Sequence, residues 1–158
     1  MSKFYRIMSY DRARKKAMRY CSFQERCVFD LEKRFYAWNV KKSDWDKILD
    51  VLLKEDFLNE SRYVEAFVRG KFRIKKWGRN KIKMGLMAKR VFNEQQFNTI
   101  SDSEIPEDEY LEAISVLIQK KSLLINEPDD FKRRGKLYRY MIGKGYESEL
   151  ILKELNLT

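Results

Sequence analysis

The stretch FLNESRYVEAF, from Phe57 to Phe67, decides the fold together with WGRNKI, from Trp77 to Ile82. Asn59 is suited to begin a helix, because an asparagine side chain accepts hydrogen bonds from the first unpaired backbone amides of a helix. The residues that follow at helical spacing share one predicted face: Tyr63, Phe67, Gly70 and Ile74. The first stretch therefore predicts an amphipathic helix.

Gly78 interrupts this helix, and a second helix is predicted after it, with Ile82 and Leu86 on its apolar face. A glycine in a helix interior costs roughly 1 kcal/mol relative to alanine. Gly70 therefore indicates the close approach of another helix. Trp77 has two interpretations that the sequence leaves open: an exposed indole that stacks on a partner, or a core side chain that closes the helix junction.

The same alternation of cap, apolar stripe and stop recurs along the chain with a period of about 48 residues, starting near Asp11, Asn59 and Glu107. A period of this length is typical of helical repeats. Trp45, Ile48, Leu49, Leu52 and Leu53 form the clearest stripe of the first repeat. We predict an all-α fold of three tandem three-helix repeats, packed as an elongated, curved array. The boundaries are a tail at 1–10 and repeats at 11–58, 59–105 and 106–158.

Further polar residues predict where helices begin or end. Ser22, followed by Glu25, has the capping-box spacing that would begin a second helix, and Ser43 with Asp46 predicts another N-terminus. Asn93 and Ser148 are predicted caps later in the chain. Asn39 is a predicted stop, because asparagine tolerates the left-handed conformation that closes helices.

The composition argues against an enzyme, a metal protein and a membrane protein. The chain has no histidine, and its two cysteines, Cys21 and Cys27, are expected to be reduced thiols. No nucleophile motif, phosphate-binding loop or dinucleotide-binding glycine pattern is present. No window reaches the roughly 18 apolar residues of a membrane span. We predict no catalytic residue, no cofactor and no metal, and expect a cytoplasmic monomer.

A run without acidic residues extends from Ala66 to Asn93 and carries ten lysines and arginines, within a chain of formal net charge +10. A charge run is often only a solvated helix face. This one crosses two predicted helices with a single sign, so its self-repulsion opposes folding unless a partner benefits from it. We therefore interpret the run as a binding surface for a polyanion or an acidic protein.

The opening stretches resemble the central signature of the RecX family, a helix with an Arg–aromatic pair followed by a glycine and a basic helix. The third repeat is similar to the closing pattern of that family through Leu137, Tyr138, Met141, Gly145 and Tyr146. The resemblance extends from about Arg12 to Leu155. Arg90 stands where the family has a glycine before the last helix of the central repeat.

The resemblance implies three tandem three-helix repeats and a regulator that binds the RecA recombinase filament on DNA. Such a regulator mainly inhibits filament growth, ATP hydrolysis and strand exchange in recombination, DNA repair and the SOS response. Contact with single- or double-stranded DNA phosphates is also expected. The predicted contact residues are Arg62, Arg69, Lys71, Arg73, Lys75, Lys76, Trp77, Arg79, Lys81, Lys83, Lys89 and Arg90.

The alternative is a DNA-binding helical module, of helix-turn-helix type, that uses the predicted helix from Arg79 to Arg90. That helix carries many lysines and few of the side chains that discriminate bases, Asn80 being the main exception. Non-specific DNA contact therefore suits the sequence better than base readout.

Overall fold

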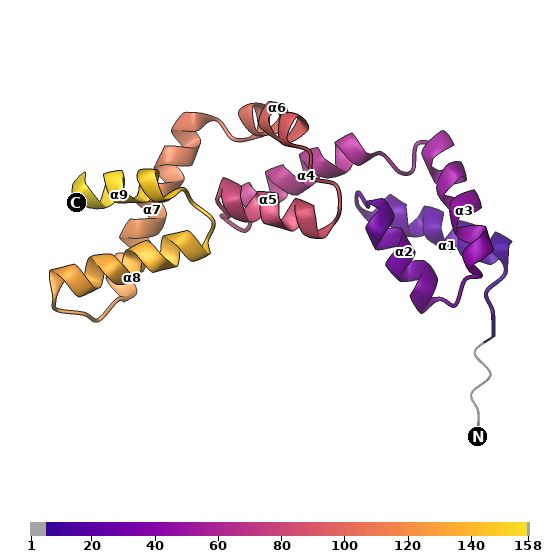
Figure 1. The fold of residues 1–158 in the computed structure, drawn as a ribbon, viewed down its shortest axis with the longest axis horizontal. Coiled ribbons are helices and arrows are strands. Elements are labelled where there is room, and N and C mark those ends of the chain that lie inside the picture. Colours follow the sequence, from indigo (N-terminus) through magenta and orange to yellow (C-terminus); the bar gives the residue numbers. More distant parts are fainter. Residues whose placement is uncertain (1–5, 158) are drawn as a thin grey trace, which may run out of the picture. The chain divides into compact units, whose positions relative to one another are not determined.

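The computed structural model describes residues 6–157, which form nine α-helices and no β-strand (Figure 1). The prediction of an all-α chain with three helices in each repeat is confirmed. The helices are α1 (Tyr10–Phe23), α2 (Val28–Ala37), α3 (Lys42–Lys54), α4 (Glu60–Arg73), α5 (Arg79–Ala88), α6 (Glu94–Glu104), α7 (Glu107–Leu124), α8 (Asp130–Gly143) and α9 (Ser148–Leu157). None of these helices is long and apolar enough to cross a membrane.

The helices belong to two compact units. The first unit contains the chain up to Ala66 together with Lys89–Val91, and the second contains Phe67–Ala88 and the chain from Phe92 onward. The repeat boundaries given above stay a prediction.

The core of the first unit lies between α1, α2 and α3. Ala13 and Ala17 are fully buried on α1, and such small side chains let neighbouring helices approach closely. Phe35 of α2 lies beside Trp45 with ring centroids 5.8 Å apart, and the Trp45 indole donates a hydrogen bond to the Val40 carbonyl at 3.1 Å. The apolar stripe of α3 completes this core with Ile48, Leu49 and Leu52.

Two buried tyrosines form the centre of the second unit. The rings of Tyr110 on α7 and Tyr146 before α9 are 5.2 Å apart, and Phe72 of α4 lies 5.8 Å from Tyr110. Aromatic pairs at these separations contribute beyond their buried area. Ile82, Leu86, Ile114, Ile118, Met141 and Ile151 are also buried in this unit.

Left-handed residues follow the ends of five helices in the manner predicted for Asn39, whose φ is 56°. Asp56, Lys76 and Arg90 adopt φ values of 59°, 58° and 59°, and Gly145 has a φ of 95°. Arg90 therefore occupies a conformation that glycine adopts without strain, which is consistent with the glycine that the family has there.

Two of the predicted caps are confirmed. Asn59 Oδ1 accepts a hydrogen bond from the Arg62 amide at 3.0 Å, and Asn93 Oδ1 accepts one from the Gln96 amide at 2.9 Å.

Three predicted caps are wrong. Ser22 lies inside α1 and donates to the Met18 carbonyl at 2.8 Å, a local bond that serine makes within helices. Ser43 lies inside α3, whose N-cap is Lys41. Ser148 is the first residue of α9, and its hydroxyl lies 2.9 Å from that of Tyr138.

Two residues assigned to apolar stripes point outward, and one glycine has a different role. Leu53 is 51% exposed and Ile74 is 78% exposed, because each lies at the edge of its stripe near a helix end. Gly70 is approached by no atom within 4 Å of where a Cβ would stand, so the predicted close helix approach there is wrong.

Candidate functional site

The twelve predicted contact residues follow one another along α4, the α4–α5 connection, α5 and the turn after it. Arg62, Lys89 and Arg90 belong to the first unit, and the other nine belong to the second unit. The side chains fall into two groups, one paired with carboxylates and one not.

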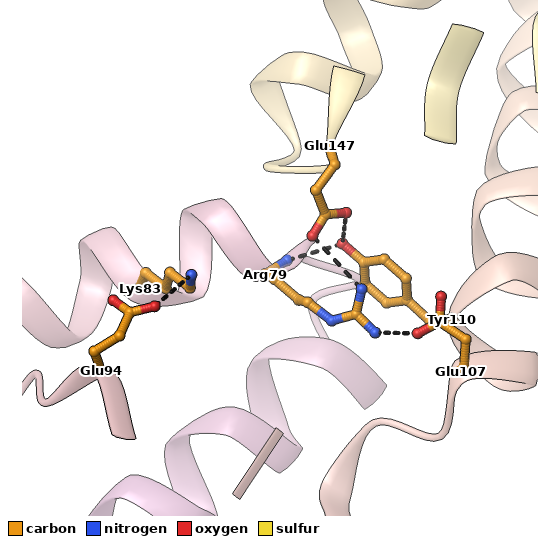
Figure 2. A network of polar contacts seen from close by, with 6 residues as sticks. All are labelled: Arg79, Lys83, Glu94, Glu107, Tyr110 and Glu147. Atoms are coloured by element: carbon orange, nitrogen blue, oxygen red, sulfur yellow. Dashed lines mark hydrogen bonds and ion pairs between the residues drawn. The ribbon is translucent and has the colours of Figure 1, made fainter. Parts of the chain in front are cut away.

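Arg79, at the start of α5, is the centre of a polar network (Figure 2). Its Nη2 donates to Glu107 at 2.5 Å, and its Nη1 lies 3.6 Å from Glu147. The guanidinium also lies over the ring of Tyr110, 3.8 Å from the centroid. Burial opposes the charge of Arg79, but the hydrogen bond to Glu107 and the fields of Tyr110 and Glu147 raise its pKa. Arg79 therefore links α5 to α7 and to the residue before α9.

Two glycines bring the α4–α5 and α8–α9 connections into backbone contact. The Gly78 amide donates to the Lys144 carbonyl at 2.8 Å, and the Asn80 amide donates to the Gly145 carbonyl at 2.9 Å. A Cβ on Gly78 would lie 2.4 Å from the backbone of Gly145, and one on Gly145 would lie 2.3 Å from Cβ of Lys81. The glycines of the motif thus permit a close approach within the second unit.

Three more basic residues of the second unit are paired with carboxylates from outside the acid-free run. Arg69 makes two hydrogen bonds to Glu104, at 2.9 and 2.7 Å. The hydrogen bond from Arg69 lowers the pKa of Glu104. Arg73 lies 3.5 Å from Glu109, and Lys83 lies 3.4 Å from Glu94.

Two basic residues of the first unit are paired in the same way. Arg62 contacts Glu25 at 3.0 Å and Asp56 at 2.8 Å. Lys89 contacts the buried carboxylate of Asp30 at 2.6 Å. Burial would raise the pKa of Asp30, but the bonds from Lys89 and from the Cys27 amide lower it.

Unpaired cations of the acid-free run lie over Trp77. The Nζ atoms of Lys71 and Lys81 lie 4.7 and 4.6 Å from the centroid of the indole ring. Lys144 donates to the Lys75 carbonyl at 3.0 Å, and its pKa is lowered by burial and by the charge of Lys81. In the part of the chain that the structure describes, no carboxylate lies within 4 Å of these ammonium groups. We name this surface the Trp77 patch: Lys71, Lys75, Lys76, Trp77, Lys81 and Lys144.

Trp77 packs into the helix junction, as one of the two interpretations that the sequence left open expected. Its side chain is half-buried, 6.5 Å from the Phe67 ring by centroid, and it lies against Gly85, where a Cβ would be 3.4 Å from the indole. The two lysines lie over the same ring. The indole therefore closes the helix junction and also positions the cations of the patch.

Comparison with known proteins identifies two of the three repeats. The model for the second three-helix domain of RecX matches residues 59–94, and the model for the third matches residues 107–155. The chain belongs to the RecX family. A regulatory protein RecX from Clostridium beijerinckii is 36% identical over 114 residues, which is 69% of this chain and 50% of the relative. One from Clostridium acetobutylicum is 34% identical over 115 residues, 70% of this chain and 53% of the relative.

Solved RecX structures share the fold. The crystal structure of RecX from Lactobacillus salivarius superposes with a TM-score of 0.76 at 19% identity, covering 94% of this chain and 97% of that chain. A second crystal structure of regulatory protein RecX gives a TM-score of 0.76 at 20% identity, covering 93% of this chain and 73% of that chain. The chain spans about half the length of the curated RecX relatives it matches.

The two RecX domain matches together contain the residues that meet around Arg79, on α5, on α7 and before α9. The predicted contact residues lie in the second domain match, and Glu107, Tyr110, Lys144 and Glu147 lie in the third. Lys144 was missed from the sequence because it stands in isolation between Gly143 and Gly145. The signal that could have found it is the pair of glycines Gly78 and Gly145, whose close approach allows the Lys144 carbonyl to meet the Gly78 amide.

Cys21 and Cys27 are free, buried thiols, and burial raises the pKa of Cys21 to about 11. Such thiols are poor nucleophiles at neutral pH. Among residues 6–157, no three His, Cys, Asp or Glu side chains come together in a way that could hold a metal ion. The RecX relatives named above are called regulatory proteins, a name that describes no reaction.

Proposed function

We propose that this chain binds a RecA filament on DNA and restrains filament growth and activity without chemistry of its own. The observation that carries the proposal is the Trp77 patch, where Lys71 and Lys81 lie over one indole with no carboxylate beside them. Membership of the RecX family and the net charge of +10 support it. The field of the chain favours DNA phosphates and acidic protein surfaces.

The arrangement of the patch favours phosphate or carboxylate contact over base stacking. The indole of Trp77 is half-buried and already has two ammonium groups over its ring, so little of the ring face is free for a base. Ammonium groups bind phosphate as point charges with no sequence preference. We expect the patch to recognise the charged backbone of a filament.

The geometry of α5 speaks against helix-turn-helix readout of DNA. In that mode, the N-terminal residues of the recognition helix contact base edges in the major groove. Here the N-terminal turn of α5 packs against the α8–α9 connection, where Asn80 donates its amide to Gly145 and Arg79 is held by Glu107. Insertion of this end of α5 into a groove would require these contacts to break.

The test reverses three charges of the patch through Lys71→Glu, Lys75→Glu and Lys81→Glu. A matched control reverses three exposed lysines outside it: Lys47, Lys54 and Lys153. Both variants change the net charge by the same amount, so a general field effect would appear in both. Arg79 is left in place, because its replacement would break the network around Tyr110.

RecA ATP hydrolysis and strand exchange on single-stranded DNA are measured with the parent protein and with each variant. We expect the parent to inhibit both reactions, the patch variant to require at least about tenfold more protein for half inhibition, and the control variant to match the parent. Circular dichroism verifies that each variant is folded. Equal inhibition by a folded patch variant would contradict the assignment of the patch, and no inhibition by the parent would contradict the proposed function.

A further inference from the structure

We propose that a groove between α8 and α9 docks an acidic amphipathic helix of a protein partner. The two helices pack side by side in the second unit (Figure 1). This surface differs from the Trp77 patch, and its proposed ligand is a protein segment.

The groove is hollow and has an apolar floor. Its volume is about 590 Å³, and Gly135, Tyr138, Leu152 and Leu155 contribute to its lining. Leu152 remains 48% exposed, and Phe131 at the groove edge is 88% exposed. Large exposed apolar side chains that line one hollow are typical of an interaction surface.

The edge of the groove is strongly basic. Its lining contains four cations and one carboxylate, a net charge of +3: Lys132, Arg134, Lys136, Arg139 and Glu127. Glu127 lies 3.1 Å from Lys136 and neutralises that residue. Among the described residues, no carboxylate lies within 4 Å of the charged groups of Lys132, Arg134 and Arg139.

Arg133 holds the connection before α8 in place. Its guanidinium donates to the Ile125 carbonyl at 2.9 Å, to Ser122 Oγ at 2.6 Å and to the Ser122 carbonyl. These bonds fix the segment that leads into the first turn of α8, where Phe131 stands. An exposed anchor on a fixed element loses little conformational freedom when it binds.

Charge and shape together select the occupant. A helix that presents apolar side chains at spacings of three and four residues fills an apolar groove, and carboxylates on its flanks would meet Arg134 and Arg139. A nucleic acid backbone would satisfy the cations but would leave the apolar floor uncovered. A second copy of this chain carries the same charge of +10, so mutual repulsion opposes it.

The probe is a synthetic peptide of roughly 16 residues, about four helical turns, with leucines spaced three and four apart and glutamates elsewhere. A control peptide has serine in place of each leucine and the same charge. Binding of the fluorescently labelled peptides to the full chain is measured by anisotropy, without RecA or DNA. The outcome is therefore independent of the proposed function.

Two variants test the apolar and the electrostatic contributions of the groove separately. Phe131→Ser with Leu152→Ser removes exposed apolar surface, and Arg134→Glu with Arg139→Glu reverses the edge charge. The matched control is Lys47→Glu with Lys153→Glu, which changes the net charge equally outside the groove. We expect the leucine peptide to bind the parent and the control alike, and each groove variant to lose at least about tenfold in affinity.

Several outcomes would overturn the proposal. The first is that the leucine peptide does not bind the parent. The second is that the serine peptide binds equally well, which would indicate simple ion exchange. The third is that the charge variant, which alters exposed residues only, keeps full affinity while circular dichroism shows that it is folded. If the groove variants lose oligonucleotide binding but keep peptide binding, the groove binds phosphate. If the parent forms a dimer in sedimentation and the groove variants do not, the groove serves self-association.

Discussion

The backbone amide of Arg79 donates to the phenol oxygen of Tyr110 at 3.0 Å, and this phenol in turn donates to Glu147 at 2.7 Å (Figure 2). Tyr110 is fully buried, so its hydroxyl must find partners inside the protein. A single phenol thus joins the first turn of α5, the first turn of α7 and the residue before α9. Arg79 contributes to this joint through its backbone as well as its side chain.

Tyr110→Phe should destabilise the second unit by about 1–3 kcal/mol. The substitution keeps the ring but removes the acceptor of the Arg79 amide and a donor to Glu147, leaving polar groups unpaired at a buried position. Urea unfolding followed by circular dichroism measures the loss. Tyr36→Phe, at a residue 82% exposed, is the control and should change stability by less than about 0.5 kcal/mol. An equal effect of the two substitutions would mean that the phenol network contributes nothing.

Gly78→Ala and Gly70→Ala should change stability in opposite directions. A Cβ at Gly78 would stand 2.4 Å from the backbone of Gly145, so the two connections must separate, and we expect a loss of at least about 2 kcal/mol. At Gly70 no atom is within 4 Å, so alanine should stabilise α4 by about 0.5–1 kcal/mol. Thermal melts of the two variants measure the changes. If both melting temperatures move in the same direction, the close approach at Gly78 is contradicted.

Helix content and repeat number could be predicted from the sequence because caps and apolar spacing are local. Asn59 and Asn93 cap the helices that follow them, and Asn39 ends a helix in the left-handed conformation as expected. Serines were less informative. Ser22 satisfies its hydroxyl within α1, because serine can bond the preceding turn of a helix as easily as it caps the next one.

The division of the basic run into paired and unpaired residues could not be predicted, because it depends on residues distant in sequence. The carboxylates of Glu104, Glu107 and Glu109 follow the run in the chain, and the fold brings them against Arg69, Arg79 and Arg73. Glu107 and Glu109 in the first turn of α7 therefore pair with arginines of the run, in addition to placing favourable negative charge at a helix N-terminus. Sequence separation hides such pairing even when the residue types suggest it.

Lys89→Met should destabilise the first unit by an amount that grows with pH. The pKa of Asp30 lies below its ordinary value while Lys89 is present, so the pair stabilises the fold above about pH 4 and this contribution is lost as pH falls through the lowered pKa. Without Lys89 the carboxylate is buried and lacks its counter-ion. We expect a loss of about 2–3 kcal/mol at pH 7 that shrinks toward pH 3, measured by urea unfolding at several pH values. Lys54→Met is the control, and a pH-independent loss would contradict the role of Asp30.

Arg90→Gly should stabilise the chain or leave its stability unchanged, although most substitutions to glycine destabilise. The left-handed φ of 59° costs a side-chain-bearing residue about 1 kcal/mol, which glycine avoids, while glycine cannot replace the guanidinium that lies 5.2 Å from the Phe29 ring centroid. Ala88→Gly, in the last turn of α5, is the comparison and should destabilise by about 0.5–1 kcal/mol. Thermal melts of both variants measure the difference. A lower melting temperature for Arg90→Gly than for Ala88→Gly would contradict the strain argument.

Replacing unpaired cations of the second unit should weaken DNA binding, whereas replacing paired cations should mainly lower stability. Lys71→Met with Lys81→Met removes two charges of the Trp77 patch while keeping their apolar stems against the indole. Arg69→Met with Arg73→Met removes the same charge from residues already bound to Glu104 and Glu109. If the patch binds phosphate, the lysine variant should bind oligo-dT more weakly, and its log–log salt slope should fall by roughly 1.4, about 0.7 for each phosphate that is no longer neutralised.

The arginine variant should keep a salt slope close to that of the parent, because carboxylates that occupy the two guanidinium groups compete with phosphate for them. Its stability should fall slightly, by about 0.5–1 kcal/mol, since both arginines are half exposed and screened by solvent. Fluorescence titrations at several salt concentrations, together with urea unfolding, measure both quantities on both variants. If the arginine variant loses as much salt slope as the lysine variant, then the carboxylates do not withhold the arginines from DNA. The binding surface would in that case be the whole basic run, as the sequence indicates, and the Trp77 patch would contribute no more to DNA binding than the paired arginines.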